Sequence, residues 1–213
     1  MSCAICETRR PRRFCPGVRG DICSICCGTE REVTVDCPLT CEYLQKARKR
    51  DKAVAIEPAQ VPDQDIQVSE KFVDEHEPLV VYLGSALAKT AFETPGAVDF
   101  DVREALDSLI RAYRTLASGV LYESLPPNPL AAYIHRSMQA AITEFARQEQ
   151  ERFGMTRTRD ADVLRLLVFL RRIELYRNNG RRRGRAFLDA LREFYSAKPG
   201  SVPPPSSSSL ILP

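Results

Sequence analysis

The sequence predicts an all-α protein: a bundle of four or five helices that follows a small, cysteine-rich, zinc-binding module. Two observations predict this fold class. From about residue 69 onward, apolar residues recur three and four positions apart in segments bounded by helix caps. All eight cysteines, by contrast, lie between Cys3 and Cys41, a clustering typical of a compact metal-binding module. With 213 residues, the chain is long enough for both units.

These patterns divide the chain into four parts. Residues 1–52 form the cysteine-rich module. Residues 53–68 contain prolines and aspartates without apolar periodicity, so we expect an extended, flexible acidic linker. Residues 69–198 form the helical bundle, and residues 199–213 are rich in proline and serine and are expected to be disordered.

Helix signals set the ends of the first two long helices. The first is expected to begin near Pro78, because proline suits an opening turn, and to stop at Pro95. The second is expected to begin at Asp101, with Glu104 three residues later as in a capping box, and to end before Gly119. Residues 69–77 precede the first of these helices and could add a turn before it.

Three further helices follow a proline-containing loop. The third is expected to be capped by Asn128 and to end at Gly154. The fourth, capped by Asp160 and broken at Asn178, is apolar over most of its circumference, so we expect it to be the central helix. The fifth covers residues 185–197.

The cysteine spacing predicts two metal sites. Two cysteines separated by two residues can bind one ion from a single tight turn, and eight thiolates fill two tetrahedral sites. In a cross-braced arrangement the first Zn²⁺ is bound by Cys3, Cys6, Cys23 and Cys26, and the second by Cys15, Cys27, Cys37 and Cys41. Metal binding on the order of 10 kcal/mol per site would supply most of the folding free energy of so small a module.

Two other interpretations of the cysteines compete with zinc. An iron–sulfur cluster is one, because Cys15 and Cys37 are each followed by proline, and redox or catalytic thiols are the other. The spacing also leaves open which of Cys26 and Cys27 serves which ion.

The pattern CAIC…FCPG…ICSICC…CPLTC, within residues 3–44, resembles the cross-braced fingers of the HIT and MYND families, whose ligands alternate between two zinc ions. Those families use a late histidine and a second close pair where this chain has only Cys15. Their finger is mainly a protein-binding platform, so the resemblance implies a protein partner. The run CPGVRGDICSICCGTEREV also resembles a motif of uncharacterised bacterial proteins, which implies no activity.

Charge is distributed unevenly along the chain. Residues 1–52 carry 11 basic and 7 acidic side chains, residues 53–110 carry 3 and 12, and residues 111–213 carry 17 and 9. At the start of the fifth helix, where the dipole disfavours cations, stands a basic run that needs solvent or an anionic partner. That partner is either an external anion such as nucleic acid or the acidic segment 53–110. The run consists of Arg181, Arg182, Arg183 and Arg185.

Motifs for catalysis are missing from the sequence. It contains no glycine-rich phosphate loop, HExxH or GxSxG, and neither His76 nor His135 has neighbours typical of a catalytic site. The sequence has no apolar run of about 18 residues and no hydrophobic N-terminal signal, so we expect a cytoplasmic protein without a membrane partner, in which thiols stay reduced.

The sequence therefore predicts a non-enzymatic, zinc-binding adaptor. Its finger and its helical bundle would each bind a protein, and a second copy of the chain is a further candidate partner. The alternative is a nucleic-acid-binding protein that uses the finger and the arginine clusters.

Overall fold

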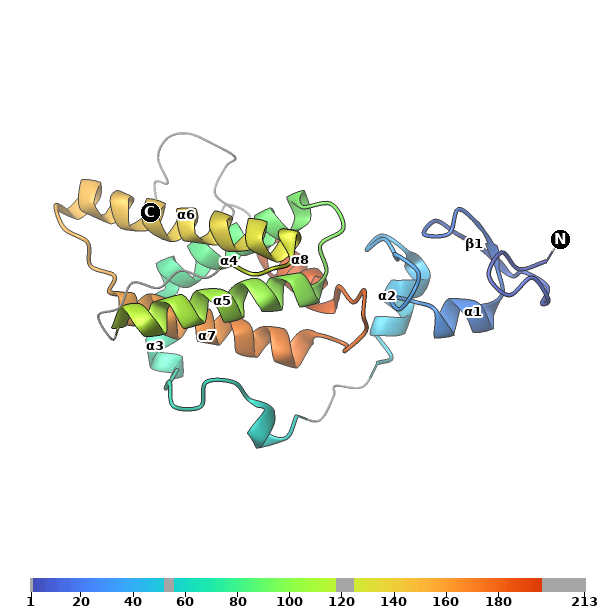
Figure 1. Cartoon of the computed structure of the whole chain (residues 1–213), viewed down its shortest axis with the longest axis horizontal. Helices are drawn as coiled ribbons and strands as arrows, with labels where there is room; N and C mark the ends of the chain where they lie inside the picture. Colours follow the sequence, from blue (N-terminus) through green and yellow to red (C-terminus); the bar gives the residue numbers. More distant parts are fainter. Residues whose placement is uncertain (1, 52–55, 118–124, 197–213) are drawn as a thin grey trace.

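The computed structural model describes residues 2–51, 56–117 and 125–196. Its main body consists of five long helices: α4 (Glu77–Glu93), α5 (Asp99–Ala117), α6 (Pro129–Phe153), α7 (Asp160–Arg177) and α8 (Ala186–Ser196). Helix α4 packs on α6, α6 on α5, α5 on α7, α7 on α8, and α8 back on α4, so the contacts among the five helices close a ring. Figure 1 shows these helices from the side. The prediction of an all-α bundle is confirmed.

The interior of this ring is the apolar core. Every long helix contributes side chains, because each has apolar residues three and four positions apart on one face. The largest side chains that are almost fully buried in this core are those of Leu83, Leu87, Leu106, Leu109, Ile134, Met138, Leu166, Leu167, Leu170 and Phe187. The core cluster contains no residue of the cysteine-rich module, so the bundle has a core of its own.

Helix α6 begins and ends where the sequence predicted. The side chain of Asn128 accepts a hydrogen bond from the backbone N–H of Leu130 (3.0 Å), which satisfies one of the free donors at the helix start. Gly154 at the C-terminal cap has φ +73°, a left-handed conformation that favours glycine. Both signals are local, and both are confirmed.

Two other predicted caps are corrected. Helix α5 begins at Asp99, and Asp101 lies in its first turn, where its carboxylate accepts the backbone N–H of Val98 (2.8 Å). Asp101 thus occupies the third position of the helix and binds the backbone N–H of the residue before the helix, rather than being the cap itself. Helix α7 begins at Asp160, but Arg159 is its N-cap, and Asp162 accepts the Arg159 N–H (3.2 Å).

Helix α7 is not surrounded by the other long helices, contrary to the prediction that it is central. It packs on α5 and α8, and non-helical chain covers another part of it. Arg172 on α7 donates to the backbone oxygens of Asp63 (2.7 Å) and Ile66 (2.9 Å). The short helix α3 (Glu70–Glu75) also approaches α7, where Arg165 lies over the ring of Phe72. This covering explains why α7 is apolar over so much of its circumference.

The predicted linker, residues 53–68, is only partly a free connection. Residues 53–55 lie outside the described residues, and a 3-10 turn, η1 (Pro58–Gln60), follows. Asp63 and Asp65 then pair with Arg114 of α5 (2.7 and 2.8 Å), so arginine of the bundle neutralises this acidic segment. The second half of the segment is therefore fixed to the bundle. The predicted tail, residues 199–213, lies outside the described residues.

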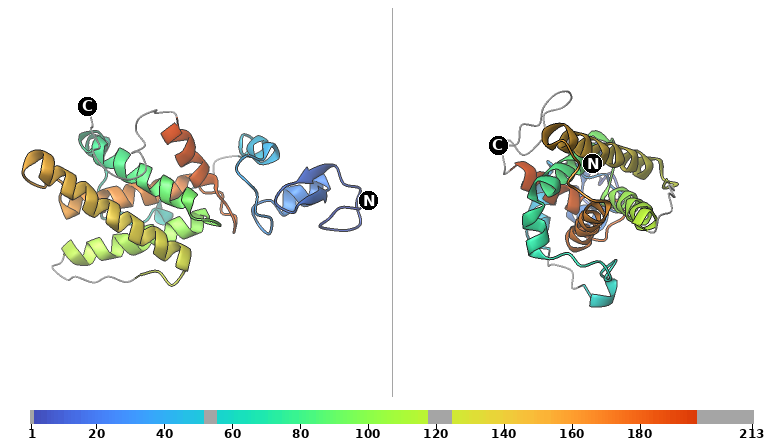
Figure 2. Two further views of the ribbon diagram at one scale, coloured as in Figure 1. Left: turned by 90° about the horizontal axis from the view of Figure 1, so that it is seen from above. Right: turned by 90° about the vertical axis from the view of Figure 1, so that its left-hand side faces the viewer.

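The cysteine-rich module extends from one end of the bundle, as the views in Figures 1 and 2 agree. It contains an antiparallel hairpin of β1 (Arg13–Cys15) and β2 (Gly20–Ile22), followed by the helices α1 (Ser24–Thr29) and α2 (Glu42–Arg48). Its two buried clusters consist of a few side chains each, and cysteines make up much of both. None of the helices described here combines the length and apolar character needed to cross a bilayer.

Candidate metal centre and module docking

Four cysteines of the module converge on one point. The sulfur atoms of Cys3, Cys6, Cys23 and Cys26 all lie within 4.8 Å of one another. A tetrahedron of sulfurs around Zn²⁺, with Zn–S bonds of about 2.3 Å, has edges of about 3.8 Å. These four thiols, which we call the first cysteine group, can therefore hold one metal ion, and they are the first ligand set that the spacing predicted.

Short-range backbone geometry builds the first cysteine group. Cys23 is the N-cap of α1, and its sulfur accepts the backbone N–H of Cys26 (3.4 Å), which places both ligands on one helical turn. The backbone N–H of Cys23 in turn donates to the sulfur of Cys3 (3.2 Å), which joins the two pairs. Such N–H donors stabilise thiolates and orient metal ligands.

The thiols of this group differ in acidity. Hydrogen bonds, first from the side chain of Thr8 and then from backbone N–H groups, lower the pKa of Cys6 to about 5. Burial, followed by the neighbouring thiols, raises the pKa of Cys26 to about 12. Because a metal ion binds thiolates, binding must displace the proton of Cys26, so the affinity for metal falls as the pH is lowered.

The remaining four cysteines are less closely gathered. Cys15, Cys37 and Cys41 share one apolar cluster with Val35 and Leu44. Burial raises the pKa of the Cys37 thiol, against a hydrogen bond from the backbone N–H of Glu32 that lowers it. Among the described residues, the first cysteine group is the set of metal-ligand side chains that meets the 4.8 Å separation.

Cys27 lies apart from that apolar cluster. It packs against the first cysteine group, and the guanidinium groups of Arg13 and Arg31 each approach its sulfur to 3.9 Å. The structure thus separates the adjacent Cys26 and Cys27, which the sequence could not do: Cys26 belongs to the first cysteine group and Cys27 lies outside it.

Neither histidine belongs to the cysteine group. The ring of His76 stacks on Phe72 (4.3 Å between centroids), and its Nδ1 lies 2.9 Å from the Phe72 carbonyl oxygen. Its Nε2 is 3.9 Å from Asp162 of α7. His135 is buried on α6. Both side chains are part of the bundle.

Three of the four arginines of the basic run contact the cysteine-rich module. Arg181 donates to the backbone oxygen of Arg31. Arg183 and Arg185 pair with Asp36 at 3.6 and 3.1 Å. Arg182 is exposed. Intramolecular neutralisation, one of the two interpretations of this basic run, therefore applies, but the carboxylate comes from the module rather than from residues 53–110.

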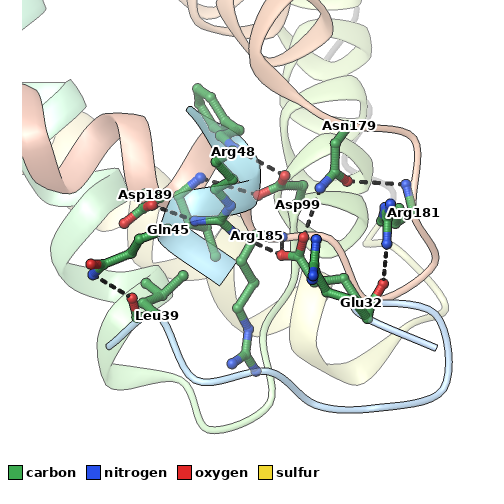
Figure 3. Close-up of polar contacts among 12 residues, drawn as sticks. Glu32, Leu39, Gln45, Arg48, Asp99, Asn179, Arg181, Arg185 and Asp189 are labelled. Carbon is green, nitrogen blue, oxygen red and sulfur yellow. Dashed lines mark hydrogen bonds and ion pairs between the residues drawn. The ribbon is translucent and has the colours of Figure 1, made fainter. Parts of the chain in front are cut away.

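Glu32 of the module is the centre of this contact (Figure 3). It is only 1% exposed, and its carboxylate accepts hydrogen bonds from Arg48 Nη2 (2.6 Å), Asn179 Nδ2 (2.8 Å) and the backbone N–H of Arg185 (3.0 Å). Its backbone oxygen accepts the N–H of Arg183 (2.8 Å). Four hydrogen bonds thus converge on one residue.

Arg48 of α2 extends this contact to helix α8. Besides Glu32, it pairs with Asp189 of α8, so one guanidinium joins two carboxylates from different units. Gly184 allows the loop to fold this tightly, because a Cβ there would lie 2.4 Å from the side-chain oxygen of Asn179. The sequence did not single out Glu32, Arg48 or Asp189. The arginine run at residues 181–185 has no acidic residue next to it in the sequence, and this indicated that it needs anionic partners from elsewhere.

Comparison of the chain with family models, with curated proteins and with solved structures found no match. The resemblance to HIT and MYND fingers therefore rests on the cysteine spacing alone and stays a prediction.

Replacement of Gly17 by alanine tests the close packing of the module. A Cβ at Gly17 would lie 2.5 Å from the backbone oxygen of Asp36 and 2.8 Å from Val35 Cγ1, so backbone must move. We expect a loss of about 1–3 kcal/mol in module stability, measured as weaker affinity for Zn²⁺ in competition with a chelator. Gly28→Ala is the matched control, because a Cβ there meets nothing within 4 Å. Equal affinities of the two variants would contradict this packing.

Proposed function

We propose that this chain is a non-enzymatic, zinc-dependent adaptor whose cysteine-rich module binds a protein partner. The observation that supports the proposal is a small module that combines four cysteines able to hold a metal ion with apolar side chains on its surface. Phe14 is 61% exposed and Ile25 is 53% exposed. A module with so small an apolar core would gain stability by burying these side chains, so their exposure indicates an interaction surface. Aromatic and aliphatic side chains on a rigid support are typical anchors of protein interfaces.

The chemistry of the first cysteine group supports zinc. Four thiolates without a histidine or carboxylate favour zinc or iron, and a separation within 4.8 Å fits a single ion. An iron–sulfur cluster holds its cysteines around several metal atoms and so needs a wider group. We propose a second Zn²⁺ on Cys15, Cys27, Cys37 and Cys41, supported by the shared apolar cluster of three of them.

The hairpin presents the first anchor. Phe14 stands in the middle of β1, opposite Asp21 of β2, and the alternation of a strand places Arg12 on the same side. Arg13, on the other side, lies 3.9 Å over the ring of Tyr43 and so packs within the module. The outward side of the hairpin therefore combines an apolar anchor with an exposed guanidinium.

Nucleic-acid binding remains the second candidate function. The exposed Arg9, Arg10 and Arg12 of the module support it, because clustered arginines can contact phosphates. The contacts of Arg181, Arg183 and Arg185 with the module reduce the number of arginines that could serve it.

A pull-down with the full-length, immobilised protein distinguishes these functions. We expect a specific protein to bind with weak dependence on salt, and the Phe14→Ala variant to lose at least about 1–2 kcal/mol of binding free energy, as an interface anchor does. Phe100→Ala is the matched control, since Phe100 is similarly exposed (55%) but belongs to the bundle helix α5. Recovery of nucleic acid whose binding falls steeply with salt, or undiminished binding by the Phe14 variant, would contradict the proposal.

A further inference from the structure

We propose that metal binding by the module controls whether the module stays docked on the bundle, and that Glu32 is the residue through which this control acts. This inference rests on the metal site of the proposed function, but not on the identity of the partner. It follows from three features: how the segment that contains Glu32 is held, how much that segment depends on metal, and what docking requires.

Cysteine residues hold the segment that contains Glu32 at both ends. At its start, the backbone N–H of Glu30 donates to the oxygen of Cys26 (2.9 Å), a member of the first cysteine group. Further on, the backbone N–H of Val35 donates to the oxygen of Glu30 (3.1 Å), and Val35 packs in one apolar cluster with Cys37. Glu32 itself has φ +54°, a left-handed conformation that non-glycine residues rarely adopt. The surrounding contacts must maintain this conformation, because it is unfavourable in isolation.

The module supplies little packing energy that could maintain this geometry without metal. Its two apolar clusters are built around Ile22 and around Val35 and Leu44, with cysteines as most of the other buried members. Units of this size usually need metal or disulfides to fold, and the cysteines here are free. Loss of metal therefore removes the main constraint on the segment.

Docking, in turn, requires the native position of Glu32. Its carboxylate is buried against Arg48, Asn179 and the backbone N–H of Arg185, and a buried carboxylate of this kind is favourable only while all of its partners are in place. A module that has lost its structure cannot keep this arrangement. The bundle, with its separate core, stays folded and exposes the surface formed by Asn179, Arg185 and Asp189.

Hydrogen exchange of the full-length chain tests this control. The amides of Arg183 and Arg185 donate to Glu32 and so report docking, whereas the amide of Leu106 in the core of α5 reports the bundle. Native mass spectrometry of the same samples reports bound metal. We expect chelation to speed exchange at Arg183 and Arg185 on the order of a hundredfold, while Leu106 stays protected.

Variants of Glu32 separate docking from metal binding. Glu32→Gln, which keeps the side-chain shape, and Glu32→Ala are expected to retain metal but to exchange rapidly at Arg183 and Arg185. Glu30→Gln is the matched control, because the Glu30 carboxylate accepts a hydrogen bond from Thr34 of the same segment (2.6 Å), and this variant should behave as the parent protein.

Two results would overturn the inference. Continued protection of both amides after the metal has been removed would show that docking does not depend on metal. Continued protection in both Glu32 variants would show that another residue holds the module. If the purified protein binds no metal at all, the proposed function fails as well, and the mass spectrum distinguishes that outcome from the other two.

Discussion

The Cys26→Ser variant is expected to lose the first metal ion and, with it, the folded state of the module. Structural zinc sites contribute on the order of 10 kcal/mol to the folding of modules of this size, far more than their few apolar contacts. The sulfur of Cys26 is buried within the first cysteine group, where a serine hydroxyl is a poor ligand for zinc. Native mass spectrometry should therefore show fewer bound ions, and hydrogen exchange should show loss of protection in the β1–β2 hairpin.

Two substitutions in the same helix serve as controls. Ser24→Ala changes an exposed residue of α1 and should leave the metal content unchanged. Cys27→Ser should leave the ion of the first cysteine group bound and the hairpin protected, because Cys27 lies outside that group. A Cys26→Ser protein that retains its full metal content and its hairpin protection would disprove the proposed role of the group.

The helices were predictable because their signals are local. Asn128 caps the helix that begins next to it, and Gly154 ends the same helix in a left-handed conformation, so neighbouring residues decide both ends. The start of α5 shows the limit of such reasoning. The carboxylate of Asp99 accepts the backbone N–H groups of Phe187 and Leu188, at 3.0 and 3.1 Å, and so caps a different helix. A cap that acts 88 positions along the chain leaves no local pattern.

The first cysteine group was predictable for a similar reason, because two cysteines separated by two residues lie on one tight turn and can face the same point. The docking contact was not. Glu32 and Asn179 are separated by 147 positions, and the sequence contains many carboxylates that could pair with the arginine run. Charge balance predicts that acidic partners exist, but only the fold selects Glu32 and Asp36 among them.

A buried ion network in the bundle leads to the second large effect. Glu174 of α7 is fully buried, and its carboxylate accepts hydrogen bonds from Arg103 of α5 (2.9–3.2 Å) and from Arg171 (2.9 Å). Arg171 also donates to Asp107 (2.7 Å), so the network joins α5 to α7. The two arginines therefore depend on one carboxylate for much of their charge compensation.

The Glu174→Ala variant is expected to lower the free energy of unfolding by about 3–5 kcal/mol, because it leaves two partly buried guanidinium groups without that partner. Urea denaturation followed by far-UV circular dichroism measures the change. Glu144→Ala is the matched control: Glu144 also pairs with an arginine, Arg147 (2.6 Å), but on the exposed surface of α6, where such a pair contributes less than about 1 kcal/mol. If both variants lost equally little stability, the arginines would be able to reach solvent, and the network would not be what joins α5 to α7.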